Sequence, residues 1–321
     1  MLSAKFKSIL LLIFCSCKLA AQTADSLTDL VNKASEQTKN RYYTPIVKGP
    51  NELNLLLAAD SLARVNNNVA AQATINEELG YYYYMADPDK CIEYNIKTYA
   101  FYNELNNKKR AVQCFQNIAF AYDEQKHNFP EAAKYTSLAI QAQTDLKDTL
   151  SMANMYKYLG LLQGKMHEFV AAKKNEAEAI RLFTLKKFML GAAVCYRDLA
   201  IVYEEEHNPD SIIINILKAK KIWMAENKDA PRLFDANNIL IRAYTSQNKL
   251  HDAATVFHKN ESMMNSRPMQ DTRRVYSEVL DYYKTCQTFF SKKNDDKTAK
   301  EYLSKYNAYK ETLKQQGYNV D

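Results

Sequence analysis

Glycine and proline are scarce in this sequence. Its 321 residues include only 6 Gly and 7 Pro. A chain rich in β-strands needs many tight turns, and such turns depend heavily on these two residues. Apolar residues make up 47% of the chain, which is enough to bury a core. The composition therefore predicts an all-α fold and argues against a β, an α/β or a disordered chain.

A concentrated basic region is also missing. The formal net charge is +6, and acidic and basic residues are interspersed along the chain. A nucleic-acid-binding protein should gather Lys and Arg on one face, so we expect no nucleic-acid partner. The sequence contains no HExxH, GxGxxG, GxxxxGKS, GxxxxGKT or GxSxG motif. We therefore expect no enzymatic activity, no cofactor and no metal.

Long apolar runs are absent except near the N-terminus. There, two lysines precede the run SILLLIFCSC, which LAAQ follows. This order is typical of a secretory signal peptide, and about ten apolar residues are too few for a permanent transmembrane helix. We predict a signal peptide at 1–21, cleaved after Ala21, and export to the periplasm or cell envelope of a Gram-negative bacterium. The alternative is a lipoprotein anchored at Cys15 or Cys17.

No two cysteines have the CxxC spacing of a zinc or redox site. Cys91, Cys114, Cys195 and Cys286 remain after export and are widely spaced. The repeat described next keeps them farther apart than the Cα separation of about 4.4–6.8 Å that a disulfide needs. We predict four small, buried, unpaired side chains.

What the sequence does contain is a repeat of about forty residues. Its first copy is Leu79-Gly80-x-x-Tyr83: a large apolar residue, a small residue and, after two more positions, an aromatic or long residue. The pattern recurs at steps of 39, 41, 40, 41 and 46 residues. The later copies begin at Ile118-Ala119, Leu159-Gly160, Leu199-Ala200, Leu240-Ile241 and Cys286-Gln287.

A second set of residues follows each copy by about thirteen positions. Its members are four and three residues apart, which places each set on one face of a helix. Each repeat is therefore predicted to contain two amphipathic helices, an A helix and a B helix. The sets are Ile92, Ile96 and Tyr99; Ala132, Thr136 and Ala139; Ala172, Glu176 and Ala179; Ile212, Ile216 and Ala219; Ala253 and Phe257; and Ala299, Leu303 and Tyr306.

Prolines mark the starts of several B helices. Pro88, Pro130 and Pro209 lie where a B helix should begin. Proline is tolerated there because its missing N–H would have no partner in the first helical turn. Asp87 and Asn208 precede two of these prolines and are good N-cap residues.

Three histidines share one position of the repeat. His127, His167 and His207 are spaced by 40 residues and lie at the turns between A and B helices. Such turns favour residues that tolerate a left-handed backbone, as His and Asn do, and Asn248 is the later equivalent. Equivalent atoms in adjacent repeats should lie roughly 10 Å apart, so these histidines are not expected to share a metal ion.

The pattern resembles the tetratricopeptide repeat (TPR) family. The resemblance implies a right-handed α-solenoid of helix–turn–helix repeats over 69–321, with a C-terminal capping helix. Residues 22–68 are predicted to form N-terminal helices that could include one further, degenerate repeat. The residues that carry the resemblance are Leu79, Gly80, Tyr83, Ala132, Ala139, Leu159, Gly160, Ala172, Ala179, Leu199, Ala200, Tyr203, Ala219, Tyr244, Ala253 and Phe257.

Tyr81 to Tyr84 are four consecutive tyrosines that cannot form one patch, because a helix turns by about 100° per residue. Tyr83 shares the side of Leu79 and is predicted to be in the core. Gly80 should mark the closest approach of a neighbouring helix. By analogy with the family, Tyr81 and Tyr84 face the concave groove; the alternative is packing against the neighbouring repeat.

The same helical geometry predicts the rest of the groove. It is polar with a few apolar anchors and suits another protein or an extended peptide, although a solvated face without a ligand is the alternative. The predicted groove residues are Tyr81, Tyr84, Gln113, Asn117, Phe120, Lys157, Leu161, Arg197, Ile201, Asn238 and Arg242.

The predicted function is a non-catalytic interaction scaffold that could serve a sensing or assembly system. Some TPR proteins hold the C-terminal carboxylate of a peptide with Lys, Asn and Arg. Asn117, Lys157 and Arg197 lie near such positions, but their neighbours do not match, so we interpret them only as polar contacts. The alternative function is binding of a small ligand, a glycan or a peptide fragment, on Tyr81, Tyr84 and Phe120.

Overall fold

The computed structural model describes residues 50–226, 230–264, 272–318 and 320, which are helical and contain no strand. The predicted all-α class is therefore confirmed. The predicted signal peptide, Cys15 and Cys17 lie outside the described residues. None of the helices in the described part of the chain is long and apolar enough to cross a membrane.

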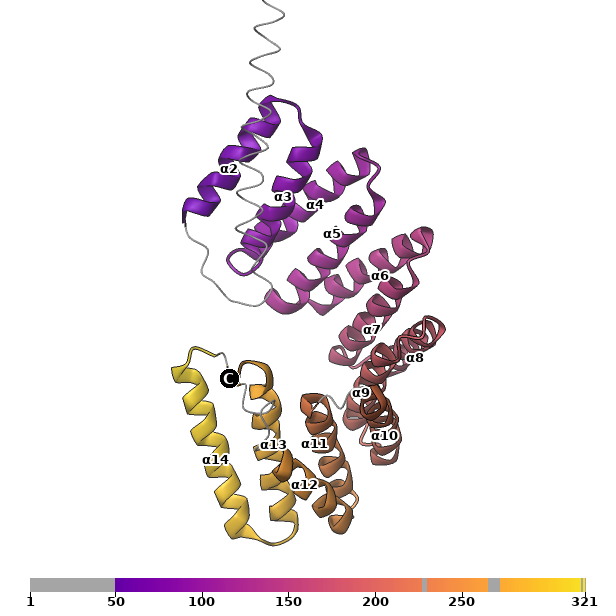
Figure 1. Ribbon diagram of the computed structural model, residues 1–321, viewed down its shortest axis with the longest axis vertical. Helices are drawn as coiled ribbons and strands as arrows, with labels where there is room; N and C mark the ends of the chain where they lie inside the picture. Colours follow the sequence, from indigo (N-terminus) through magenta and orange to yellow (C-terminus); the bar gives the residue numbers. More distant parts are fainter. Residues whose placement is uncertain (1–49, 227–229, 265–271, 319, 321) are drawn as a thin grey trace, which may run out of the picture. The chain divides into compact units, whose positions relative to one another are not determined.

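The chain divides into two compact units, Met1–Asp148 and Thr149–Asp321 (Figure 1). The described part of unit 1 contains α2 (Pro50–Val65), α3 (Val69–Tyr83), α4 (Pro88–Glu104), α5 (Lys108–Phe120), the short π-helix η1 (Ala121–Gln125) and α6 (Phe129–Leu146). Unit 2 contains α7 (Thr149–Lys165), α8 (Phe169–Leu185), α9 (Met189–Glu205), α10 (Pro209–Glu226), α11 (Ala230–Ser246), α12 (Leu250–Met264), α13 (Thr272–Lys292) and α14 (Asp296–Gln315).

Within each unit, consecutive helices pack as antiparallel hairpins (Figure 1). The A helices are α3, α5, α7, α9, α11 and α13, and the B helices are α4, α6, α8, α10, α12 and α14. In unit 1 the core gathers around Leu56, Ile75, Leu79 and Ile118. In unit 2 the main core gathers around aromatic side chains, namely Trp223, Phe234, Phe257, Tyr282 and Phe289.

The predicted faces of two B helices are wrong at one residue each, whereas Ile92 in α4 and Ala299 in α14 are buried as predicted. In α4, Ile96 is half exposed, while Cys91, Asn95 and Thr98 are buried. In α14, Leu303 is likewise half exposed and Tyr302 is buried in its place. Both errors have the same cause: the buried face carries polar or bulky side chains, and the neighbouring aliphatic residues gave a better apolar pattern.

The predicted starts of the B helices are confirmed. The Asp87 carboxylate accepts a hydrogen bond from the backbone N–H of Lys90 at the start of α4. The Asn208 side chain does the same for Ser211 at the start of α10. Each cap satisfies one N–H group that the helix leaves without a partner.

The histidine turns also have the predicted backbone. His127, His167, His207 and Asn248 have φ of 50°, 59°, 53° and 59°. The A helix before His127 is one residue longer between its apolar anchor and the turn than the A helices before the other histidines. The π-helix η1 accommodates that extra residue, because a π turn holds one residue more than an α turn.

The four described cysteines are free and buried, as predicted. Burial raises the pKa of the Cys114 thiol to about 12. Desolvation also raises the pKa values of Cys195 and Cys286. These thiols therefore stay protonated at neutral pH and act as small apolar side chains.

Candidate functional site

Two glycines allow side chains of the B helices to reach the A helices. A Cβ atom at Gly80 would lie 2.8 Å from Nδ2 of Asn95, and one at Gly160 would lie 2.8 Å from Oε1 of Glu176. The predicted close approach at Gly80 is confirmed. In both places the neighbour is a polar side chain from the B helix of the same hairpin.

In unit 1 the predicted groove residues are mostly engaged within the protein. The Asn117 amide donates a 3.0 Å hydrogen bond to Oδ1 of Asn95. The Tyr84 hydroxyl donates to Glu124, and burial is the main cause that raises the pKa of Tyr84. Tyr81 and Phe120 are half-buried, and Gln113 is exposed. The aromatic platform for a small ligand stays a prediction, and the hydroxyl of Tyr84 already has a partner there.

Tyr83 occupies the predicted core position. It is buried, and its ring stacks on that of Tyr94 with centroids 5.6 Å apart. Tyr81, Tyr82 and Tyr84 are half-buried, and Tyr82 and Tyr84 pack against the edge of the same core.

In unit 2, Arg197 lies in an ion-pair network that links neighbouring A helices. Its Nε donates to Asp235 at 3.0 Å and its Nη1 to Asp198 at 2.7 Å. These carboxylates raise the pKa of Arg197, although desolvation opposes them. The guanidinium therefore joins α9 to α11.

Arg242 extends this network along the A helices. It forms a bidentate pair with Glu204 at 2.6 and 2.9 Å and contacts Asp281 at 2.6 Å. It thus joins α9, α11 and α13. The network shows that equivalent positions of successive A helices in unit 2 lie side by side. We call Lys157, Leu161, Arg197, Ile201 and Arg242 the inner row of unit 2.

Three members of the inner row remain available for contact. Lys157 is half-buried and forms no ion pair with a described residue. Leu161 is 39% exposed, and Ile201 is half-buried at the edge of the main core. Arg197 and Arg242, by contrast, each already hold two carboxylates.

Asn238 is a correction to the predicted groove. It is fully buried, because its side chain turns into the helix interface instead of away from it. Its Nδ2 donates to the backbone oxygen of Glu278 at 3.0 Å, and its Oδ1 accepts from Asn260 at 2.8 Å. The short Asn238 amide forms hydrogen bonds with buried polar groups, whereas the longer Lys157 and Arg197 side chains extend toward the surface.

Glu176 is the unusual residue of the site, and its place in the repeat predicted only a core position. It is fully buried, and neither carboxylate oxygen has a hydrogen-bond partner of good geometry among the described residues. Desolvation, followed by repulsion from Asp198, raises its pKa well above the usual value, while the Cys195 thiol, Lys157 and Arg197 act in the opposite direction. The feature of the sequence that could have singled out Glu176 is that it is an acidic residue on the apolar face of a B helix.

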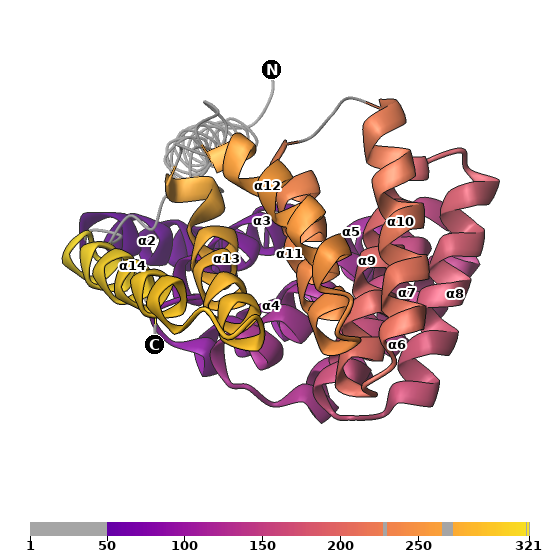
Figure 2. The ribbon, with the colours of Figure 1, turned by 90° about the horizontal axis from the view of Figure 1, so that it is seen from below.

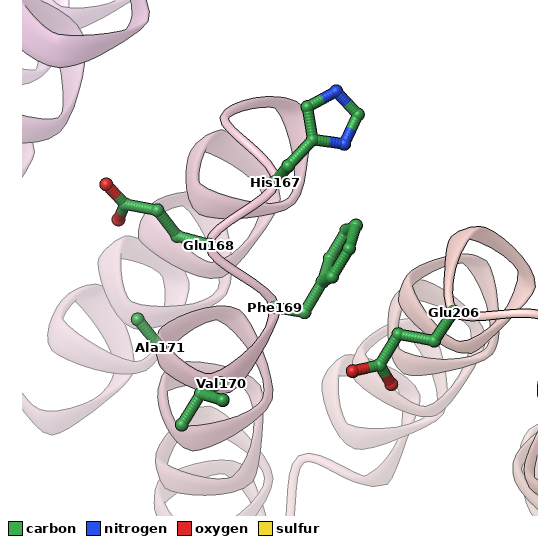
Figure 3. A pocket seen from close by; sticks show the side chains of 6 residues that line it. All are labelled: His167, Glu168, Phe169, Val170, Ala171 and Glu206. Atoms are coloured by element: carbon green, nitrogen blue, oxygen red, sulfur yellow. The ribbon is translucent and has the colours of Figure 1, made fainter.

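A shallow, solvent-open hollow lies at the turn between α7 and α8 (Figure 3). His167, Glu168, Phe169, Val170, Ala171 and Glu206 line it. The rings of His167 and Phe169 meet edge to face, and Glu206 pairs with Lys173 at 2.7 Å. Such a hollow suits surface contact more than enclosure of a small molecule. Within the described ranges, no three His, Cys, Asp or Glu side chains are grouped as metal ligands.

Known proteins of similar structure share the helical-repeat fold. A signal-transduction ATPase with numerous domains from Pyrococcus horikoshii, which has a tetratricopeptide repeat sensor, matches with a TM-score of 0.69 and 14% identity over 93% of this chain and 45% of that one. The aspartyl phosphate phosphatase F of Bacillus subtilis matches with a TM-score of 0.62 and 15% identity over 98% and 78%.

A third similar structure is a Rap protein complexed with competence and sporulation factor. It matches with a TM-score of 0.53 and 17% identity over 83% of this chain and 71% of that one. No protein-family model and no curated protein matches the sequence. The likeness confirms the TPR-like helical-repeat fold, and at these identities it shows the fold alone.

Proposed function

We propose that this protein is a non-catalytic scaffold that binds another protein or an extended peptide along the inner row of unit 2. The observation that carries the proposal is the row itself. Arg197 and Arg242 hold α9, α11 and α13 in register, while Lys157, Leu161 and Ile201 offer one cation and two apolar contacts beside them. A strip of this kind suits an extended partner with apolar side chains.

Two facts support binding over catalysis. The Cys114, Cys195 and Cys286 thiols have raised pKa values and are poor nucleophiles. A Rap protein of the same fold is known in complex with competence and sporulation factor, so the fold can present a binding surface. A structurally similar protein is named a phosphatase, and the proposal for this chain does not include that activity.

The contact residues can be tested with matched substitutions. Leu161→Glu places a charge in the inner row, and Leu217→Glu places the same charge on the exposed side of α10, where Leu217 is 48% exposed. After crosslinking in cell-envelope extract, the wild type and Leu217→Glu should recover the same partner protein, and Leu161→Glu should lose it. Equal recovery of the partner by both variants would exclude the inner row as the binding surface.

We further propose export, with a signal peptide at 1–21 and a place in the periplasm or cell envelope, where the scaffold would serve a sensing or assembly system. The repeat array is proposed to span 69–321, with α14 as the capping helix. The mass of the protein purified from its native host tests the export step. A chain starting at Gln22 supports cleavage after Ala21, a lipid-modified N-terminal cysteine supports the lipoprotein alternative, and an intact Met1 contradicts both.

A further inference from the structure

The turn between α8 and α9 exposes apolar side chains at a place where a polar residue would stabilise the fold. We call Leu185, Lys186, Lys187 and Phe188 the α8–α9 tip. Leu185 is 64% exposed and Phe188 is 46% exposed. Leu150, in the first turn of α7, is 41% exposed. Helices α7, α8 and α9 are neighbours (Figure 2), and Met152, Phe183 and Ala192 pack the start of α7 beside the end of α8 and the start of α9.

Phe188 occupies the N-cap of α9 and makes no capping hydrogen bond. At the starts of two other A helices, Asn68 and Asn107 fill this position and accept hydrogen bonds from Ala71 and Arg110. Replacing a polar cap by an apolar residue typically costs about 1 kcal/mol. A half-exposed phenylalanine is therefore a locally unfavourable choice for folding, which is a common mark of a functional residue.

Phe188 is held in place by packing and by a backbone hydrogen bond. One side of the Phe188 ring packs on Phe183, with centroids 5.6 Å apart, and lies so close to Gly191 that a Cβ there would be 2.7 Å from Cδ1 of Phe188. The backbone N–H of Phe188 donates to the carbonyl of Phe183 at 2.8 Å. Because Phe188 is already held in place, binding through its ring costs little conformational entropy.

The tip is also positively charged. No Asp or Glu occurs between Glu178 and Asp198, whereas Lys186 and Lys187 lie in the turn itself. Both lysines are exposed, and neither forms an ion pair with a described residue. Lys187 has φ of 56°, the left-handed residue that makes the turn.

We propose that the α8–α9 tip binds the surface of an anionic lipid membrane. Leu185 and Phe188 stand out from a turn instead of lining a groove, and a lipid interface accepts such protruding side chains without a matching shape. The lysines can contact the anionic headgroups, and the exposed apolar side chains beside them can enter the acyl region below. The proposal is independent of the inner row.

Vesicle binding tests whether the α8–α9 tip binds anionic lipid. The full chain and the chain beginning at Gln22 are mixed with vesicles of phosphatidylcholine alone or with an equal amount of phosphatidylglycerol, and the sedimented fraction gives the partition coefficient. The shorter chain separates the contribution of the apolar N-terminal run. We expect clear binding only with phosphatidylglycerol, weakened by added salt.

Phe188→Asn is the decisive variant, because it supplies the cap seen at Asn107 in exchange for the packing on Phe183, so the melting temperature should change little. We expect it to lower the partition coefficient about tenfold, since a large apolar contact is lost. Replacing Lys186 and Lys187 by serine should lower it by about fivefold per lysine. The matched control replaces Lys108 and Lys109 by serine at the α4–α5 turn, which keeps its Asn107 cap, and should have a smaller effect.

Phe188→Trp gives a second readout, a blue shift of tryptophan emission when the tip enters the lipid. Unchanged binding by Phe188→Asn, an equal loss in the Lys108 and Lys109 control, or no blue shift would overturn the proposal. So would a loss of a protein partner by the tip variants with vesicle binding unchanged. Leu161→Glu should bind vesicles normally, so failure here and failure of the inner row are distinguishable.

Discussion

Units 1 and 2 place a polar side chain in the same position of a hairpin with opposite results. In unit 1, Asn95 faces Gly80, accepts from Asn117 and donates to the carbonyl of Cys91 at 2.9 Å. In unit 2, Glu176 faces Gly160 and has no hydrogen-bond partner of good geometry among the described residues. A buried amide can satisfy its hydrogen bonds locally, whereas a buried carboxyl group must keep its proton or accept a large desolvation cost.

The largest effect is expected from filling the space beside the two glycines. A Cβ at Gly160 would lie 2.8, 3.0 and 3.1 Å from three atoms of Glu176, whereas one at Gly80 would approach only the amide nitrogen of Asn95 this closely. We expect Gly160→Leu to lower the free energy of unfolding by about 3 kcal/mol or more, and Gly80→Leu by less. Denaturant unfolding of both variants measures this, and equal stability with the wild type would contradict the packing described here.

Asn95→Asp would place a buried carboxyl group in unit 1, as Glu176 does in unit 2. The aspartate can still accept from Asn117, but it loses the hydrogen bond to the carbonyl of Cys91 and places a charge in the interior. We expect a loss of about 3 kcal/mol at neutral pH, recovered in part below pH 5 as the group takes a proton. Unfolding followed by far-UV circular dichroism across this pH range provides the measurement, and a pH-independent loss would argue against ionisation as the cause.

Glu176→Gln is the opposite change. The folded protein keeps the proton of Glu176 to a higher pH than the unfolded chain, whose carboxyl has a pKa near 4.5. Stability is therefore greatest below that value and falls as the pH rises toward the raised pKa of the folded state, by up to about 1.4 kcal/mol per pH unit. Glutamine removes this fall, so the variant should gain about 1–2 kcal/mol at pH 7–8 relative to the wild type.

Trp223 reports the unfolding of unit 2, because the sole tryptophan of the chain is buried there. Its fluorescence during denaturant unfolding should show the wild type losing stability with rising pH and Glu176→Gln losing less. Parallel pH profiles for the two proteins would mean that Glu176 is not the group responsible.

The smallest effect concerns the left-handed turns, which both units share. Lys147 in unit 1 and Lys187 in unit 2 each have φ of 56°. Glycine adopts this conformation without strain, but it also makes the unfolded chain more flexible. We expect Lys147→Gly and Lys187→Gly each to raise the free energy of unfolding by about 0.5 kcal/mol. A clear loss in either variant would show that the lysine side chain stabilises its turn.

Local features were predicted well. The helix starts at Asp87 and Asn208 and the left-handed turns at the three histidines follow from propensities that act within a few residues. The partners of the predicted groove residues were not predicted. Arg197 pairs with Asp235, and Arg242 with Glu204 and Asp281, which are about forty residues away in the sequence. Such partners are set by the packing of successive repeats, which helical geometry alone does not specify.

Equivalent positions of four A helices also show that helical geometry alone does not give the direction of a side chain. These positions hold Asn117, Lys157, Arg197 and Asn238. Their spacing predicted one surface, yet the two amides turn inward to buried partners, and the longer side chains remain at the surface. The length of a side chain and the nature of its neighbours decided its direction.

The sequence by itself determined that this chain forms paired helices, where several of them begin and how they turn, because periodicity, caps and left-handed residues act locally. Only the tertiary structure decided which polar groups are paired, which are buried without a partner, as at Glu176, and which apolar residues stay exposed, as at Phe188. Those outcomes depend on how close neighbouring helices come, and that distance is set by contacts between residues far apart in the chain.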